Sequence, residues 1–152
     1  MEVYRLSRAP FATPLSGKGA AIKGGRWNSI GVEMIYTAAN RSLAMAEVAV
    51  HFTLATLPAD YIMMTIQIPD NISAQKISEK ELPDGWKQFP HPPFTQKIGD
   101  AFILARNHCI LWIPSVVTQG DYNVLINPAH KEFSKIKVIK TEPFPFDQRI
   151  LK

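Results

Sequence analysis

Cysteine and long hydrophobic runs are scarce in this 152-residue sequence. Cys109 is the one cysteine, so the chain cannot form an intramolecular disulfide, which agrees with a reducing compartment. The longest apolar stretch, residues 43–57, is interrupted by Glu47 and His51 and is shorter than the roughly 20 apolar residues of a membrane-spanning helix. The N-terminus has neither the basic nor the apolar region of a secretory signal. These absences predict a cytosolic (cytoplasmic) protein with no membrane segment.

Several familiar site motifs are also absent. The sequence contains neither Gly-x-Gly-x-x-Gly nor a Walker-type Gly-Lys-Ser, so neither phosphate-loop fingerprint applies. Ser115 lacks a Gly-x-Ser-x-Gly elbow, which argues against a serine hydrolase. The residues that most often bind transition metals never show metal-ligand spacing; they are His51, His91, His108, Cys109 and His130. We therefore expect no metal.

The composition is that of one globular domain spanning 1–152, with 46% hydrophobic and 20% charged residues. The formal net charge of +4 is compatible with a solvated basic face, a phosphate-bearing small ligand or nucleic acid. The lysines are scattered, with one loose cluster in residues 131–140, and no Arg-rich or aromatic-basic run occurs. A basic nucleic-acid-binding module is therefore the weaker interpretation of the charge.

Strand patterns outnumber helix patterns along the chain. Two helices are expected, one over residues 41–54 with Asn40 as its N-cap and one from a Thr95 cap to about residue 106. Residues 10–25, with four glycines, should form a binding loop, and residues 71–94 should be irregular. Strands are expected at 3–6, 34–37, 61–68, 109–113, 124–126, 136–139 and 149–151. Because strands and helices do not alternate regularly, the predicted class is α+β.

Glu47 is the first residue whose position points to chemistry. In the expected helix it shares one stripe with Leu43, Val50 and Leu54, so a carboxylate lies among apolar residues. Burying an unpaired carboxylate is costly. Glu47 could lie in water at the edge of the stripe, pair with a structural arginine, or point into a pocket, where it would stabilise a developing positive charge.

The sequence Gly24-Gly25-Arg26-Trp27-Asn28 is the second such feature. Paired glycines permit close backbone approaches, and the guanidinium that follows is suited to two-point contact with phosphate or carboxylate. Arg26 could therefore grip a pyrophosphate or orient Glu47. The alternative is a glycine turn followed by a core tryptophan and a surface arginine.

Two expected strands end in polar residues. Ser115 follows Trp112-Ile113-Pro114, and Asn127 follows Ile126. Strand ends often carry ligand-binding groups, although capping and turn formation account for such residues equally well.

Taken in order, these stretches resemble the RES domain, a family named for an arginine, a glutamate and a serine. The resemblance also includes Val3-Tyr4-Arg5, the segment 31–38 with Tyr36, the helix around Glu47, and Asn123 to Pro128, so it covers nearly the whole chain. It places the naming residues at Arg26, Glu47 and Ser115 and implies that all three are catalytic. It further implies that Tyr36 acts in the catalytic site and that Arg5, Gly25, Trp27 and Asn127 bind the substrate.

The resemblance implies an ADP-ribosyltransferase-like fold, with short strands in a split or sandwich-like core and a few helices. It implies a toxin of a toxin–antitoxin system that cleaves the nicotinamide–ribose bond of NAD, is neutralised by an Xre-like antitoxin, and meets nucleic acid only through that antitoxin. A homodimer is left open. The acceptor is also open, since water, phosphate or a protein side chain would make the enzyme a glycohydrolase, a phosphorylase or an ADP-ribosyltransferase.

Overall fold

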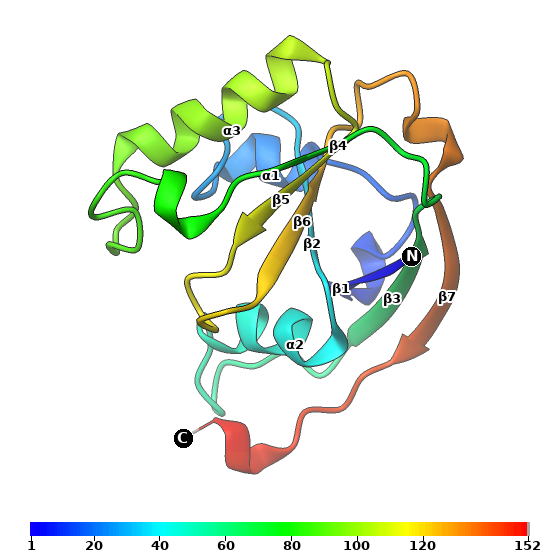
Figure 1. The fold of residues 1–152 in the computed structure, drawn as a ribbon. Coiled ribbons are helices and arrows are strands. Elements are labelled where there is room, and N and C mark those ends of the chain that lie inside the picture. Colours follow the sequence, from blue (N-terminus) through cyan, green and yellow to red (C-terminus); the bar gives the residue numbers. More distant parts are fainter. Residues whose placement is uncertain (152) are drawn as a thin grey trace.

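The computed structural model describes residues 1–151, which build a seven-stranded sheet with helices against it (Figure 1). The strand order is β4-β5-β6-β2-β1-β3-β7, and only the β4–β5 pair is parallel. The strands are β1 (Glu2–Arg8), β2 (Ile35–Ala38), β3 (Tyr61–Gln67), β4 (Ala74–Lys76), β5 (Ile110–Pro114), β6 (Tyr122–Ile126) and β7 (Lys137–Pro143). The predicted α+β class is confirmed.

Within residues 1–151, three α-helices accompany the sheet: α1 (Lys18–Lys23), α2 (Arg41–Ala49) and α3 (Pro93–Ala105). Asn40 caps α2 as predicted, because its side chain accepts a hydrogen bond from the Leu43 N–H at 2.8 Å. The 3₁₀ turns are η1 (Ala9–Phe11), η2 (Glu79–Glu81), η3 (Phe133–Lys135) and η4 (Gln148–Ile150).

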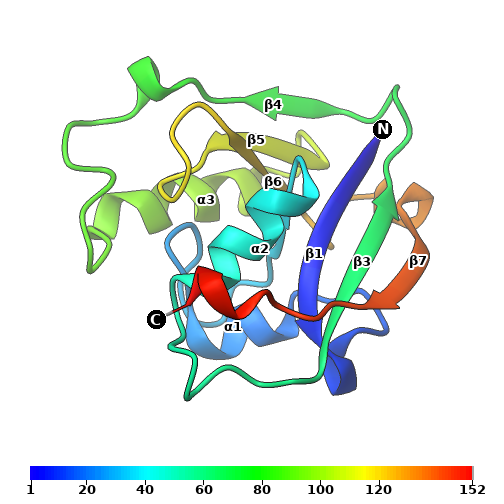
Figure 2. The ribbon, with the colours of Figure 1, turned by 90° about the horizontal axis from the view of Figure 1, so that it is seen from below.

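The sheet is split at its centre. β1 pairs with β3 from Glu2↔Gln67 to Arg8↔Tyr61, whereas β1 and β2 share only the register pair Tyr4↔Ala38. Figure 2 shows β1, β3 and β7 on one side, β4, β5 and β6 on the other, and α2 between the two groups. The expected core is therefore a split single sheet, not a sandwich of two sheets.

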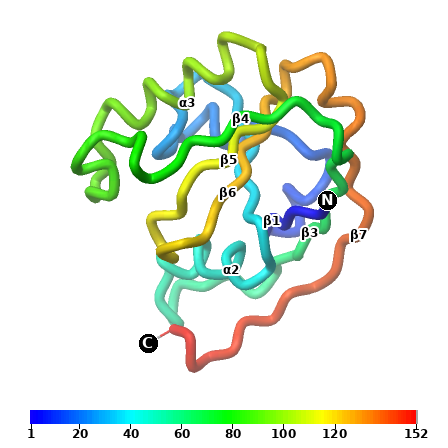
Figure 3. Tube along the Cα trace, in the orientation of Figure 1, coloured from blue at the N-terminus to red at the C-terminus, as the bar shows by residue number. Residues whose placement is uncertain are grey.

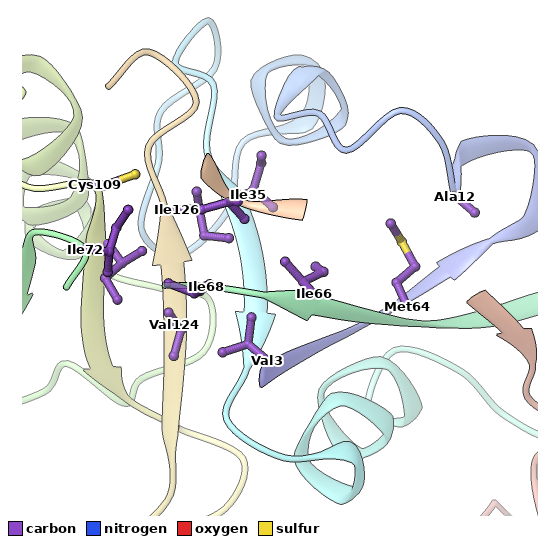
Figure 4. Packing of buried hydrophobic residues seen from close by; sticks show 12 residues of the cluster. Val3, Ala12, Ile35, Met64, Ile66, Ile68, Ile72, Cys109, Val124 and Ile126 are labelled. Atoms are coloured by element: carbon purple, nitrogen blue, oxygen red, sulfur yellow. The ribbon is translucent and has the colours of Figure 1, made fainter. Parts of the chain in front are cut away.

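The core lies on both faces of the sheet. On one face, both strand groups contribute to a cluster that includes Val3, Ile35, Ile66 and Ile126 (Figure 4). On the other face, α3 packs over the β5–β6 side through Phe102 and Ile103, and α2 packs over the β1–β3 side through Leu43 and Ala44. These two helices and the split between them define where a site can form.

Both helix predictions need correction at their ends. The first helix stops at Ala49, because residues 53–57 fold into a turn in which the Thr56 hydroxyl accepts from the Thr53 N–H. Val50 and Leu54 are exposed, so the predicted apolar stripe does not continue beyond the helix. The second helix begins at Pro93, not after Thr95, since proline suits a first helical position.

The connecting segments hold more regular structure than expected. The predicted 10–25 loop contains α1, and the 71–94 segment contains β4 and η2 before it runs irregularly into α3 (Figure 3). The expected strand at 149–151 is instead the 3₁₀ turn η4, because the Asp147 carboxylate caps it by accepting from the Arg149 N–H. The expected 136–139 strand is the longer β7.

Candidate active site

Glu47 lies half-buried on α2 and faces the end of β5 and the start of β6. Its Oε1 accepts a hydrogen bond from Ser115 Oγ at 2.8 Å and a second from Asn123 Nδ2 at 2.7 Å. Within residues 1–151, Glu47 takes part in no salt bridge, and its Oε2 has no hydrogen-bond partner. The carboxylate is thus fixed through one oxygen by two neutral donors, and the other oxygen is available to a ligand.

Ser115 is fully engaged in holding Glu47. Its hydroxyl accepts from the backbone N–H groups of Val117 and Thr118 at 3.0 and 3.1 Å and donates its one hydrogen to Glu47. The residue is 2% exposed. Ser115 thus forms a turn and donates to Glu47, and the catalytic role that the family resemblance implies for it stays a prediction.

Arg26 is held by backbone carbonyls of the segment before α3. Its Nη1 donates to Trp86 O at 2.7 Å and to Gln88 O at 3.0 Å, which leaves Nε and Nη2 without a partner among residues 1–151. Burial lowers the pKa of Arg26, and the nearby Glu47 carboxylate opposes that shift, although the two form no ion pair. One edge of the guanidinium therefore remains free for two-point contact with an anion.

Tyr36 anchors residues 24–28, here called the glycine loop, to the sheet. Its hydroxyl donates to Asn28 Oδ1 at 2.6 Å and accepts from the Trp27 N–H at 3.1 Å. A Cβ on Gly25 would lie 2.7 Å from that hydroxyl, so only glycine fits. Burial raises the pKa of Tyr36, and the phenol remains a hydrogen-bond donor at neutral pH. This packing places Arg26 beside β2.

Three predicted substrate-binding residues have internal partners instead. Trp27 is 3% exposed and its ring lies 6.2 Å from that of Trp86. Asn127 is fully buried at the opposite end of β6 from Asn123, where it donates to Ile103 O. Arg5 Nη1 donates to Tyr36 O at 2.9 Å, so it bridges the split where β1 and β2 diverge. Contact of these residues with substrate stays a prediction.

Sequence reasoning missed the groups that hold the site together. Asn123 lay inside a recognised motif but received no role, and the carbonyls of Trp86 and Gln88 belong to a segment without a motif. Gln96 of α3 also contributes, since its Nε2 donates to Gly25 O and Asn28 O at 3.0 Å each. Alternation along β6 would have placed Asn123 on the Leu125 face, which is the only signal available beforehand.

Two kinds of structural feature are absent from residues 1–151. No helix in this range is long and apolar enough to cross a membrane. In the same range, no three His, Cys, Asp or Glu side chains gather into a group that could hold a metal ion.

Comparison with known proteins decides the family. The model of the RES domain matches residues 2–147. The chain belongs to the RES family. Its curated relatives include a Prs ADP-ribosylating toxin of Sphingobium sp. (strain YBL2), which is 36% identical, with 96% of this chain and 92% of that protein covered. A Toxin Res of Photorhabdus laumondii is 34% identical, with 100% of this chain and 98% of that protein covered.

A solved structure has the same fold as this RES protein. The match is to the crystal structure of the M. tuberculosis MbcT–MbcA toxin–antitoxin complex, with a TM-score of 0.75 and 20% identity; it covers 95% of this chain and 84% of that one. The expected ADP-ribosyltransferase-like RES fold is thereby confirmed.

Proposed function

We propose that this RES-family protein is an enzyme that cleaves the nicotinamide–ribose bond of NAD. The observation that carries the proposal is that two opposite charges lie near each other and both have free hydrogen-bonding atoms. These are one edge of the Arg26 guanidinium and one carboxylate oxygen of Glu47, and other groups hold each side chain in place. NAD offers the complementary chemistry, since its pyrophosphate accepts from a guanidinium and its ribose hydroxyls donate to a carboxylate.

The bond to be broken determines what the site must do. When the C–N bond breaks, its electron pair moves to the pyridinium nitrogen and nicotinamide leaves as a neutral molecule, so no general acid is required. The ribose carbon gains oxocarbenium character, which an anion stabilises strongly in a site shielded from water. Glu47 supplies that anion, Arg26 holds the pyrophosphate, and the Tyr36 ring packs against ribose or nicotinamide. The acceptor, which is water, phosphate or a protein side chain, then bonds to the ribose carbon, and any proton that it loses passes to solvent.

The biological role proposed here is that of a toxin in a toxin–antitoxin pair. Two kinds of finding support it: relatives that carry the name Toxin Res, and a structural neighbour solved together with an antitoxin. Depletion of NAD in the cytoplasm would stop growth, so a partner must restrain the enzyme. We propose an Xre-like antitoxin for that partner.

ADP-ribosylation of a protein target is the second candidate. It requires the same bond cleavage with a protein side chain as acceptor, and the name of the Sphingobium relative, an ADP-ribosylating toxin, favours it. The residues of the site serve both reactions equally.

One assay under three conditions separates the candidates. Purified protein is mixed with NAD in buffer, in buffer with phosphate, and in buffer with cell extract, and the products are identified by mass spectrometry. Free ADP-ribose indicates water as acceptor, ADP-ribose 1″-phosphate indicates phosphate, and a protein gaining ADP-ribose indicates transfer. Intact NAD under all three conditions would overturn the proposal, and salt-sensitive nucleic-acid binding would then support a basic module.

A further inference from the structure

Asn123 donates to Glu47 from a backbone position inside the sheet. It lies on β6, whose backbone pairs on one side with β2 at Ala38 and on the other with β5 at Ile113. Ser115, the other donor to Glu47, lies beyond the end of β5 in a turn. A residue paired on both sides of a sheet has little freedom to move, so Asn123 sets the reference position for the carboxylate.

Both donors bind the same carboxylate oxygen. Asn123 Nδ2 approaches Glu47 Oε1 at 2.7 Å and Ser115 Oγ approaches it at 2.8 Å. Two donors from different elements prevent the carboxylate from rotating, and because both are neutral, they leave its negative charge intact. Oε2 is therefore the oxygen left free to bind a ligand.

The fold has other means of holding α2 in place. Leu43 and Ala44 bury α2 against the sheet, and Asn40 caps its N-terminus. The contact between Asn123 and Glu47 is thus not needed to dock the helix. What the contact does is orient the Glu47 side chain.

We propose that Asn123 is a positioning residue for NAD cleavage: it fixes Glu47 through Oε1 so that Oε2 meets the ribose as positive charge develops. This inference rests on the function proposed above. Since the reaction depends on the placement of a charge, loss of one donor lowers turnover more than substrate affinity.

The test compares Asn123→Ala with Asn71→Ala, a change at an exposed asparagine between β3 and β4. For Asn123→Ala we expect kcat to fall about 10- to 100-fold, with KM within about threefold of wild type and an unchanged circular dichroism spectrum. Asn123→Asp keeps the shape but replaces the donor with a second carboxylate, so its kcat should be lower still. Wild-type kcat in Asn123→Ala would overturn the proposal.

A double-mutant cycle shows whether Asn123 acts through Glu47. In a Glu47→Gln background, Asn123→Ala should cause little further loss, because the charge that it positions is already gone. An equal loss in both backgrounds would contradict the positioning role and indicate a separate structural effect.

The contact is also measurable without activity. Glu47→Ala should shift the side-chain amide signals of Asn123 in a ¹H–¹⁵N spectrum and leave those of Asn71 in place. If the wild type cleaves NAD but Asn123→Ala retains full kcat, only the positioning role falls. If the wild type leaves NAD intact, both the proposed NAD cleavage and the positioning role fall. The amide signals then show only whether Asn123 contacts Glu47.

Discussion

Glu47 lies near enough to Arg26 to affect its pKa, yet each side chain is held only by neutral partners. Arg26 binds two backbone carbonyls, and Glu47 binds a hydroxyl and a carboxamide. A direct ion pair between them would use the hydrogen-bonding capacity of both side chains. Neutral partners instead fix the two groups and leave their charges available to a ligand.

We predict that Arg26→Lys damages substrate binding. An ammonium has only three hydrogens on one point charge, so it cannot bridge Trp86 O and Gln88 O and also bind a phosphate at two points. KM for NAD should rise about 10- to 100-fold while the melting temperature changes little. Arg106→Lys, at an exposed arginine, is the matched control. Unchanged KM and kcat in Arg26→Lys would remove Arg26 from the site.

The charged residues of the candidate site could be predicted from the sequence, but the groups that hold them in place could not. Glu47 stood out because a carboxylate interrupted an apolar stretch, and Arg26 because it followed two glycines. The Trp86 and Gln88 carbonyls carry no side-chain identity, so no sequence pattern reports them. Asn127 and Asn123 look alike in sequence, and only the strand register shows that Asn123 reaches Glu47 while Asn127 binds Ile103 O.

Among the elements, α3 is positioned by a close backbone contact. A Cβ on Gly99 would lie only 1.6 Å from Trp27 O, so the helix can approach the glycine loop only where it carries no side chain. Asp100 strengthens this contact by accepting from the Ser29 N–H at 2.9 Å. The loop that carries Arg26 is therefore held between β2 and α3.

Gly99→Ala should consequently destabilise the protein. The helix must move away from Trp27, and we expect a cost of about 3 kcal/mol or more, or a fall in melting temperature on the order of 10 °C. Gly19→Ala is the control, because Gly19 lies in α1 with no atom within 4 Å of the added Cβ and should gain about 0.5–1 kcal/mol. Thermal unfolding followed by circular dichroism measures both. Equal melting temperatures for Gly99→Ala and wild type would contradict the packing described.

Long patterned elements were predictable, and short ones were not. β3 and the Asn40 cap of α2 appeared as expected because alternation and capping are local signals. β4, by contrast, has three exposed residues and exists because β5 offers a parallel edge, which is a tertiary effect. The helix α1 has two glycines directly beyond its end and was hidden inside a segment that looked like a loop.

For the whole molecule, the sheet split and the two helices that flank it bring together residues that are distant in sequence. Glu47 comes from α2, Ser115 and Asn123 from the β5–β6 region, and Arg26 from the glycine loop. The α+β class followed from the order of strands and helices, whereas the split depends on a single register pair that sequence does not reveal.

In cells, we predict that expression of this protein alone lowers NAD and arrests growth. Co-expression of an antitoxin encoded beside it should restore both, since a partner that blocks access to Arg26 and Glu47 removes the activity without altering the fold. Growth and total NAD are measured together after induction. Soluble protein with normal growth and NAD would contradict the toxin role, and arrest with normal NAD would favour modification of a protein target.

The most direct test of the account is the NAD turnover of Glu47→Gln. Glutamine keeps an Oε1 acceptor for Ser115 and Asn123, so the fold and melting temperature should persist, but the negative charge is lost. We predict that kcat falls about 100- to 1000-fold with a smaller change in KM, while Glu33→Gln, at an exposed carboxylate, stays at the wild-type rate. A folded Glu47→Gln protein that cleaves NAD at the wild-type rate would contradict the central claim.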